Sequence, residues 1–130
     1  MANKEALLFG TAGIPRSSKA QTTQAGIERT HKLGLGCMEV EFVRGVNMTP
    51  PAARDVGKAA TKRGIKLSAH APYFINLNAK ELEKMAASQE RIIQTARITA
   101  LFGGDSVVFH PAFYLKDEPS DVYNTVKKNL

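Results

Sequence analysis

The sequence contains no tryptophan and a single cysteine, Cys37, so neither an internal disulfide nor a metal site built only from cysteines can form. No apolar run approaches the roughly 20 residues that a transmembrane helix needs. The apolar stretch near the N-terminus, residues 6–9, is also shorter than the roughly seven residues that a signal peptide requires. We therefore expect a cytoplasmic protein with no membrane partner.

What remains is an ordinary globular composition. The 130 residues are 43% hydrophobic and 23% charged, which suits one domain with one core. The 18 basic and 12 acidic side chains give a formal net charge of +6. This balance favours an anionic partner without identifying it.

Short runs of β-forming residues alternate with helical patterns along the whole chain. The four β-type runs cover residues 7–11, 37–43, 65–70 and 106–110. The helical patterns that follow them cover residues 23–33, 50–63, 80–102 and 119–130. Strands that alternate with helices predict an α/β fold with a parallel sheet and right-handed crossovers.

Two of the helices carry clear local signals. Thr49 can cap the second helix, Pro50 suits its first position, and Gly64 ends it. The third helix is predicted from an apolar stripe at helical spacing. This stripe consists of Leu82, Met85, Ala86, Ile92, Ile93, Ala96 and Ala100.

Four consecutive βα units amount to half of an eight-unit barrel, which typically needs about 250 residues. Four units cannot close a barrel alone. The chain is therefore a fragment, or two copies assemble, or the sheet stays open.

Polar residues end the second, third and fourth β-type runs. Side chains alternate along a strand, so Glu41, His70 and His110 are predicted to lie on one face at neighbouring strand ends. Strands about 4.8 Å apart would let two imidazoles and a carboxylate converge on one ion. Two histidines and a carboxylate are a common catalytic zinc set.

The charged residues of these strands have a second interpretation, as internal ion pairs. Glu39 would pair with Lys66, and Glu41 with either Arg44 or Lys66, because buried charges need partners. We slightly favour this interpretation for Glu41. A histidine at a strand end is likewise more often a hydrogen-bonded structural residue than a metal ligand.

Two loops after the strands carry candidate contacts with nucleic acid. Tyr73 and Phe74 follow the third β-type run, where they could stack on bases or instead cap the mouth of the barrel. On sequence alone the two interpretations are equally supported. Arg44 follows the second run and could contact a phosphate.

Several segments resemble the endonuclease IV family of apurinic/apyrimidinic endonucleases. Residues 70–77 read H-A-P-Y-F-I-N-L, which is similar to the H-x-x-Y-x-I-N-L signature of that family. Residues 107–111 read V-V-F-H-P and resemble its F-H-P strand end. Residues 9–15 and 38–45 look like the archaeal type of these sequences. The resemblance covers essentially the whole chain, and it implies that residues 1–130 form the N-terminal half of a (βα)8 barrel in a truncated chain.

The resemblance implies a xylose isomerase-like TIM barrel that acts in DNA repair. In this family a zinc site hydrolyses the phosphodiester 5′ to abasic sites in DNA. The resemblance assigns His70 and His110 as zinc ligands, and Tyr73 and Phe74 as residues that enter the DNA. Arg44 lies in a loop that contacts DNA in the family, although its motif departs from the bacterial pattern.

The same resemblance limits what this chain can do alone. Glu41 is not a ligand in the family pattern, which favours the ion-pair interpretation of that residue. The remaining zinc ligands of the family lie on later strands and have no counterpart here. We therefore expect the isolated chain to be inactive.

Two alternatives remain open. One is a metal-dependent sugar isomerase or epimerase of the same barrel superfamily. The other is a non-catalytic half-barrel that self-associates through the exposed edges of its first and fourth strands. Tyr73 and Phe74, together with Asn76 and Leu77, favour DNA over a small sugar.

Overall fold

The computed structural model describes residues 7–130, in which strands and helices alternate strictly. The strands are β1 (Gly10–Ala12), β2 (Cys37–Glu41), β3 (Lys66–His70) and β4 (Val107–Val108). The helices are α1 (Thr23–Lys32), α2 (Pro50–Arg63), α3 (Leu82–Leu101) and α4 (Pro119–Asn129). The predicted α/β class and the order of four βα units are confirmed.

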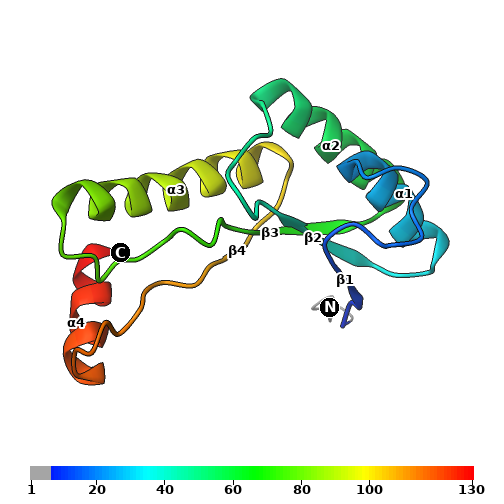
Figure 1. The fold of residues 1–130 in the computed structure, drawn as a ribbon. Helices are drawn as coiled ribbons and strands as arrows, with labels where there is room; N and C mark the ends of the chain where they lie inside the picture. Colours follow the sequence, from blue (N-terminus) through cyan, green and yellow to red (C-terminus); the bar gives the residue numbers. More distant parts are fainter. Residues whose placement is uncertain (1–6) are drawn as a thin grey trace, which may run out of the picture.

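The four strands form one parallel sheet in the order β1-β2-β3-β4. Helices α1, α2 and α3 lie on the same side of this sheet, and α4 lies beyond the end to which β4 leads (Figure 1). This arrangement is half of a barrel, with the outer helices on one face and the opposite face open. Among residues 7–130 no helix is both long and apolar enough to cross a bilayer.

The core lies between the sheet and the helices, as the alternation along the strands predicts. In β2, Met38 and Val40 are buried beneath the helices, whereas Glu41 is exposed on the other face. In β3, Leu67 and Ala69 are buried in the same way. The polar side chains of both strands therefore line the open face of the half-barrel.

Helix α2 begins and ends where the local signals place it. The Thr49 hydroxyl accepts a hydrogen bond from the backbone N–H of Ala52, and Pro50 occupies the first turn. Gly64 closes the helix in the left-handed conformation, with φ of 66°. Such a φ is strained for residues with a side chain, so glycine is the favoured terminator.

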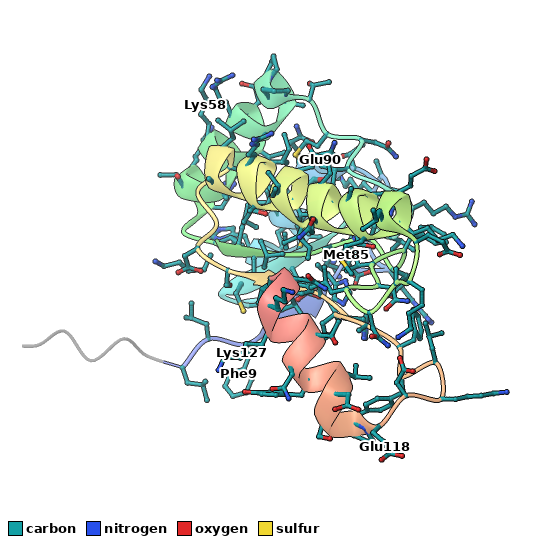
Figure 2. The ribbon with its side chains drawn as sticks, turned by 90° about the vertical axis from the view of Figure 1, so that its left-hand side faces the viewer. Phe9, Lys58, Met85, Glu90, Glu118 and Lys127 are labelled. Carbon is teal, nitrogen blue, oxygen red and sulfur yellow. The ribbon has the colours of Figure 1, made fainter. Side chains whose placement is uncertain are left out.

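The apolar stripe predicted for α3 is wrong in most of its positions. Met85 and Ile92 pack inward, and Figure 2 shows Met85 on the side of α3 that faces the rest of the fold. The other five residues of the stripe are exposed: Leu82, Ala86, Ile93, Ala96 and Ala100. The buried face instead carries Ser88, Thr95, Ile98 and Thr99.

Hydroxyl groups can occupy this buried face because the helix itself satisfies them. Thr95 donates its hydroxyl to the Arg91 carbonyl at 2.7 Å, and Thr99 donates to Thr95 at the same distance. Each hydroxyl is thereby hydrogen-bonded before any tertiary contact forms, so its burial costs little. A pattern that counts only apolar residue types therefore misplaces the buried side of α3.

The edge strands are shorter than the sequence suggests. Strand β1 begins at Gly10, where a Cβ would lie 1.9 Å from the carbonyl oxygen of Cys37. Only glycine allows this approach. The apolar residues before β1, Leu7, Leu8 and Phe9, are exposed rather than part of the core. Strand β4 pairs through two residues only. Cys37, the first residue of the inner strand β2, is half-buried.

One buried hydroxyl in α1 generates a stability prediction. Thr30 is fully buried, and its Oγ1 has no hydrogen-bond partner among the described residues. Thr30→Val keeps the side-chain shape and removes the stranded hydroxyl. We expect the free energy of unfolding in urea to rise by about 1 kcal/mol, because an unpaired buried polar group costs roughly that much or more.

The matched control is Thr95→Val in α3. Its hydroxyl is bonded to a carbonyl within the helix, so we expect a change of less than about 0.5 kcal/mol. A lower unfolding midpoint for Thr30→Val than for the parent chain would contradict the prediction.

Candidate metal and ligand site at the carboxyl ends of the strands

The register of the sheet brings the polar strand ends to one edge. Glu41 lies opposite His70, and His70 lies opposite Val108, two residues before His110. The side chains of His70 and His110 therefore project from the same face. Their rings lie side by side, with centroids 5.2 Å apart.

A third ring joins the two imidazoles. Tyr73, from the loop that connects β3 to α3, lies 5.5 Å from His70 and 5.7 Å from His110 between ring centroids. We call His70, Tyr73 and His110 the ring triad. Thus the structure brings together three of the six candidate site residues that the sequence analysis named, which also included Glu41, Phe74 and Arg44.

The hydrogen bond of His70 fixes which ring nitrogen is free. Nδ1 lies 2.8 Å from the carbonyl oxygen of Ala71. Since a carbonyl can only accept, Nδ1 must carry the proton when this bond forms. The neutral ring then keeps its lone pair on Nε2, the arrangement that a metal-ligating histidine commonly adopts.

Glu41 does not join the histidines, so the proposed three-residue constellation is wrong for this chain. Its carboxylate lies against Gly13 on the β1 side, 3.2 Å from the position that a Cβ would take there. Within residues 7–130 no group of three or more histidine, cysteine or acidic side chains can hold a metal ion. In this part of the chain, the imidazoles of His70 and His110 are therefore the candidate metal ligands.

The predicted internal ion pairs are also absent between the described residues. None of the ion pairs involves Glu39, Glu41 or Lys66. The register sets Glu39 opposite Ser68 and Lys66 opposite Cys37, so the two charges do not face each other. On the open face of a half-barrel, these side chains are solvated and need no partner.

Arg44 lies apart from the ring triad. It is exposed in the loop after β2 and lines a hollow of about 480 Å³ together with Glu41 and Asn47. Its loop lies beside the loop after β3, since the Tyr73 N–H meets the Val43 carbonyl at 3.5 Å. Arg44 therefore borders the candidate site from the side of β2.

A larger groove opens on the other side of Tyr73. It has a volume of about 880 Å³ and runs along the start of α3 to the loop after β4. Tyr73 and Phe74 line it, with exposed fractions of 49% and 63%. Its charged lining residues are Lys80, Glu81, Glu83, Lys84 and Arg91. Both aromatic residues selected from the sequence are thus accessible to a ligand.

Two asparagines connect the loops on either side of this groove, a feature that no sequence pattern indicated. Asn78 is 2% exposed, and its side-chain NH₂ donates to the carbonyl of Phe113 and to the Asp117 carboxylate, both at 3.0 Å. The Asn76 side-chain oxygen accepts from the backbone N–H groups of Phe113 and Asn78. We call Asn76 and Asn78 the asparagine clamp.

Asp117, which accepts a hydrogen bond from the clamp residue Asn78, also pairs with Lys80, and its pKa is lowered. Lys80 donates to the Asp117 carboxylate, and this bond, together with that from Asn78, holds the pKa of Asp117 below its ordinary value of 3.8. Because the pKa of Asp117 is lower in the folded state, the ionised carboxylate stabilises the folded loop at pH values above its ordinary pKa of 3.8. This contribution is lost as the pH falls through the folded-state pKa.

We therefore expect the Asp117 carboxyl resonance to titrate below pH 3.8, and its pKa to rise towards 3.8 in Lys80→Met. Lys84→Met is the control, since Lys84 pairs with Glu81 rather than with Asp117. Carboxyl-detected NMR across the acid range measures both values. An unchanged pKa in Lys80→Met would show that Lys80 does not hold this carboxylate.

Sequence comparison relates the chain to larger proteins. A family model for the xylose isomerase-like TIM barrel matches residues 27–130. An uncharacterized protein of Methanocaldococcus jannaschii is 44% identical over 124 residues, which cover 95% of this chain and 44% of that protein. The chain thus spans less than half the length of this relative.

Solved structures share the fold at low identity. A D-psicose 3-epimerase with D-fructose superimposes with a TM-score of 0.66 and 19% identity, over 85% of this chain and 41% of the epimerase. Endonuclease IV from Thermus thermophilus gives a TM-score of 0.60 and 23% identity, over 91% of this chain and 44% of the endonuclease. From the family match, the chain belongs to the xylose isomerase-like TIM barrel family, of which it forms half a barrel.

Proposed function

We propose that this chain is the N-terminal half of a zinc-dependent DNA repair endonuclease that hydrolyses the phosphodiester 5′ to abasic sites. The observation that carries the proposal is the ring triad beside the exposed Phe74. It sets two potential metal ligands next to aromatic faces at the edge where barrel enzymes hold their active sites.

The two histidines suit zinc because imidazole is a zinc ligand and because one ring nitrogen of His70 is free to bind. Imidazole nitrogen is a preferred zinc ligand, and the Ala71 carbonyl leaves Nε2 of His70 available. When bound, zinc polarises a phosphate and lowers the pKa of a bound water. Because residues 7–130 supply no third ligand, the proposal takes the other ligands from further strands of a complete barrel. This chain alone is then inactive.

Tyr73 and Phe74 provide aromatic rings that could fill the gap at an abasic site. A missing base leaves a gap in the stacked duplex, and an exposed aromatic ring can fill it or unstack its neighbours. Tyr73 also contacts both imidazoles, so a ring inserted at the lesion would set the adjacent phosphodiester beside the metal ligands. The net charge of +6 favours contact with the phosphate backbone.

A sugar isomerase or epimerase is the second candidate, because the epimerase gives the higher TM-score of the two structures described. It would use the same strand-end histidines. An uncharged sugar, however, gains nothing from the basic net charge of the chain, whereas DNA does. For this reason the endonuclease is preferred.

Zinc binding by the 130-residue chain tests the metal part of the proposal. We expect native mass spectrometry and calorimetry to show zinc bound by the parent chain and weakened at least about tenfold in His70→Ala and in His110→Ala. His31→Ala is the matched control, because His31 is exposed on α1, away from the ring triad. Equal zinc affinity in all four proteins would refute the site.

Binding of abasic DNA tests the substrate. We expect the chain to prefer a duplex with one abasic site over the intact duplex, and Tyr73→Ala to remove most of this preference. Tyr123→Ala is the control, since Tyr123 is a tyrosine on α4 that is 68% exposed, more than the 49% of Tyr73. Fluorescence anisotropy measures both affinities. Two results together would favour the epimerase. The parent chain would bind abasic and intact duplex equally, and a complete barrel protein would convert a ketohexose.

A further inference from the structure

The loop between β4 and α4 exposes three large apolar side chains in succession. Phe113, Tyr114 and Leu115 are each more than half exposed. Such a run in a loop has no role in the core, and contiguous exposed apolar surface commonly marks a binding surface. Phe113 and Leu115 line the groove that also contains Tyr73 and Phe74.

This loop is held in a costly conformation. Leu115 and Lys116 both adopt positive φ, at 52° and 69°. A bulky residue such as leucine rarely does so, and strained backbone persists only where the surroundings enforce it. Here the asparagine clamp and the Lys80–Asp117 pair enforce it. The loop is therefore built to present its side chains in one arrangement.

The opposite wall of the groove is fixed as well. Arg91 of α3 donates to the Phe74 carbonyl at 2.8 Å, which anchors the backbone behind the exposed Phe74 ring. The groove thus has an aromatic residue on each of two anchored loops. Tyr73 belongs both to the ring triad and to the lining of this groove, so the groove adjoins the triad.

The side chains around the groove suit a ligand with flat apolar parts and an anionic group near Arg91. Lys80, Lys84 and Arg91 line the groove with Glu81 and Glu83, and Asp117 lies against Lys80, so the charges balance in number. Carboxylates already pair with both lysines, but Arg91 uses one of its nitrogens on a backbone carbonyl and keeps its full charge. Aromatic walls beside an arginine suit a nucleobase and its phosphate.

We propose that Phe113 is a second base-contacting residue, and that the groove between Phe113 and Phe74 takes one unstacked base of a nucleic acid strand next to the ring triad. This inference rests on the proposed action on DNA. It adds the loop after β4 to the loop after β3 as a recognition element. In it, Asn78 is a positioning residue that keeps Phe113 in place.

The test uses a duplex that carries 2-aminopurine next to an abasic site, because the fluorescence of this base falls when it stacks on a ring. We expect the parent chain to quench it, and Phe113→Ala to lose the quenching and about tenfold in affinity. Phe113→Leu should resemble Phe113→Ala, since leucine fills space without a π-face, and Phe113→Tyr should resemble the parent. Circular dichroism confirms that each variant is folded.

Phe9→Ala is the matched control, because Phe9 is an exposed phenylalanine directly before β1, and β1 and β4 form opposite edges of the sheet. We expect its affinity and quenching to equal those of the parent. Asn78→Ala should reduce quenching with Phe113 still present, provided that the variant remains folded.

The outcomes separate this inference from the proposed function. If the parent prefers abasic DNA and Phe113→Ala or Phe113→Leu quenches like the parent, the inference alone is overturned. If the parent binds no DNA, both fail. If Phe113→Ala changes only a monomer–dimer equilibrium in sedimentation, the groove holds a second copy of the chain, and base binding is overturned.

Discussion

The parallel register of β2, β3 and β4 is the constraint on which the candidate site depends. Side chains alternate between the two faces of a strand, so a slip by one residue would turn every side chain over. The observed register sets His70 between Glu41 and Val108. A shift of one position in β3 would direct His70 towards the helices and bury Ser68 in place of Leu67. The apolar residues that pack beneath α1, α2 and α3 therefore also fix the direction of the histidines.

Sequence predicted those features that depend on short-range rules. Alternation in β2 and β3 separates buried from open-face residues because one face meets helices and the other does not. Thr49, Pro50 and Gly64 bound α2 through interactions within a few residues. The pairing of the two histidines followed from alternation and from adjacency of consecutive strands. In each case the signal is local, and the tertiary structure only has to agree with it.

The errors arise where a side chain meets a partner that is distant in sequence, or satisfies itself. Thr95 and Thr99 look polar, yet each is buried because its hydroxyl bonds to the carbonyl one turn back. Glu41 was expected near a cation, but its carboxylate lies against Gly13 of another loop. Asn78 bonds to Phe113 and Asp117, more than thirty residues away. Only the backbone path of the loop after β4 reveals this role, so no pattern of residue types indicates it.

The ring triad lies near the open edge of the half-barrel, so the closure of a complete barrel and the metal site at the triad are connected. His70 is the last residue of β3 and His110 follows β4, and within residues 7–130 the outer edge of β4 pairs with no strand. In the proposed endonuclease, the next strand of a complete barrel pairs with that edge, and its end comes within one strand spacing of His110. The nearest further ligand and the pairing that protects β4 would then come from the same segment. An edge strand of two residues forms only a short ladder, and the hydrogen bonds from Asn76 and Asn78 to the loop after β4 add to it.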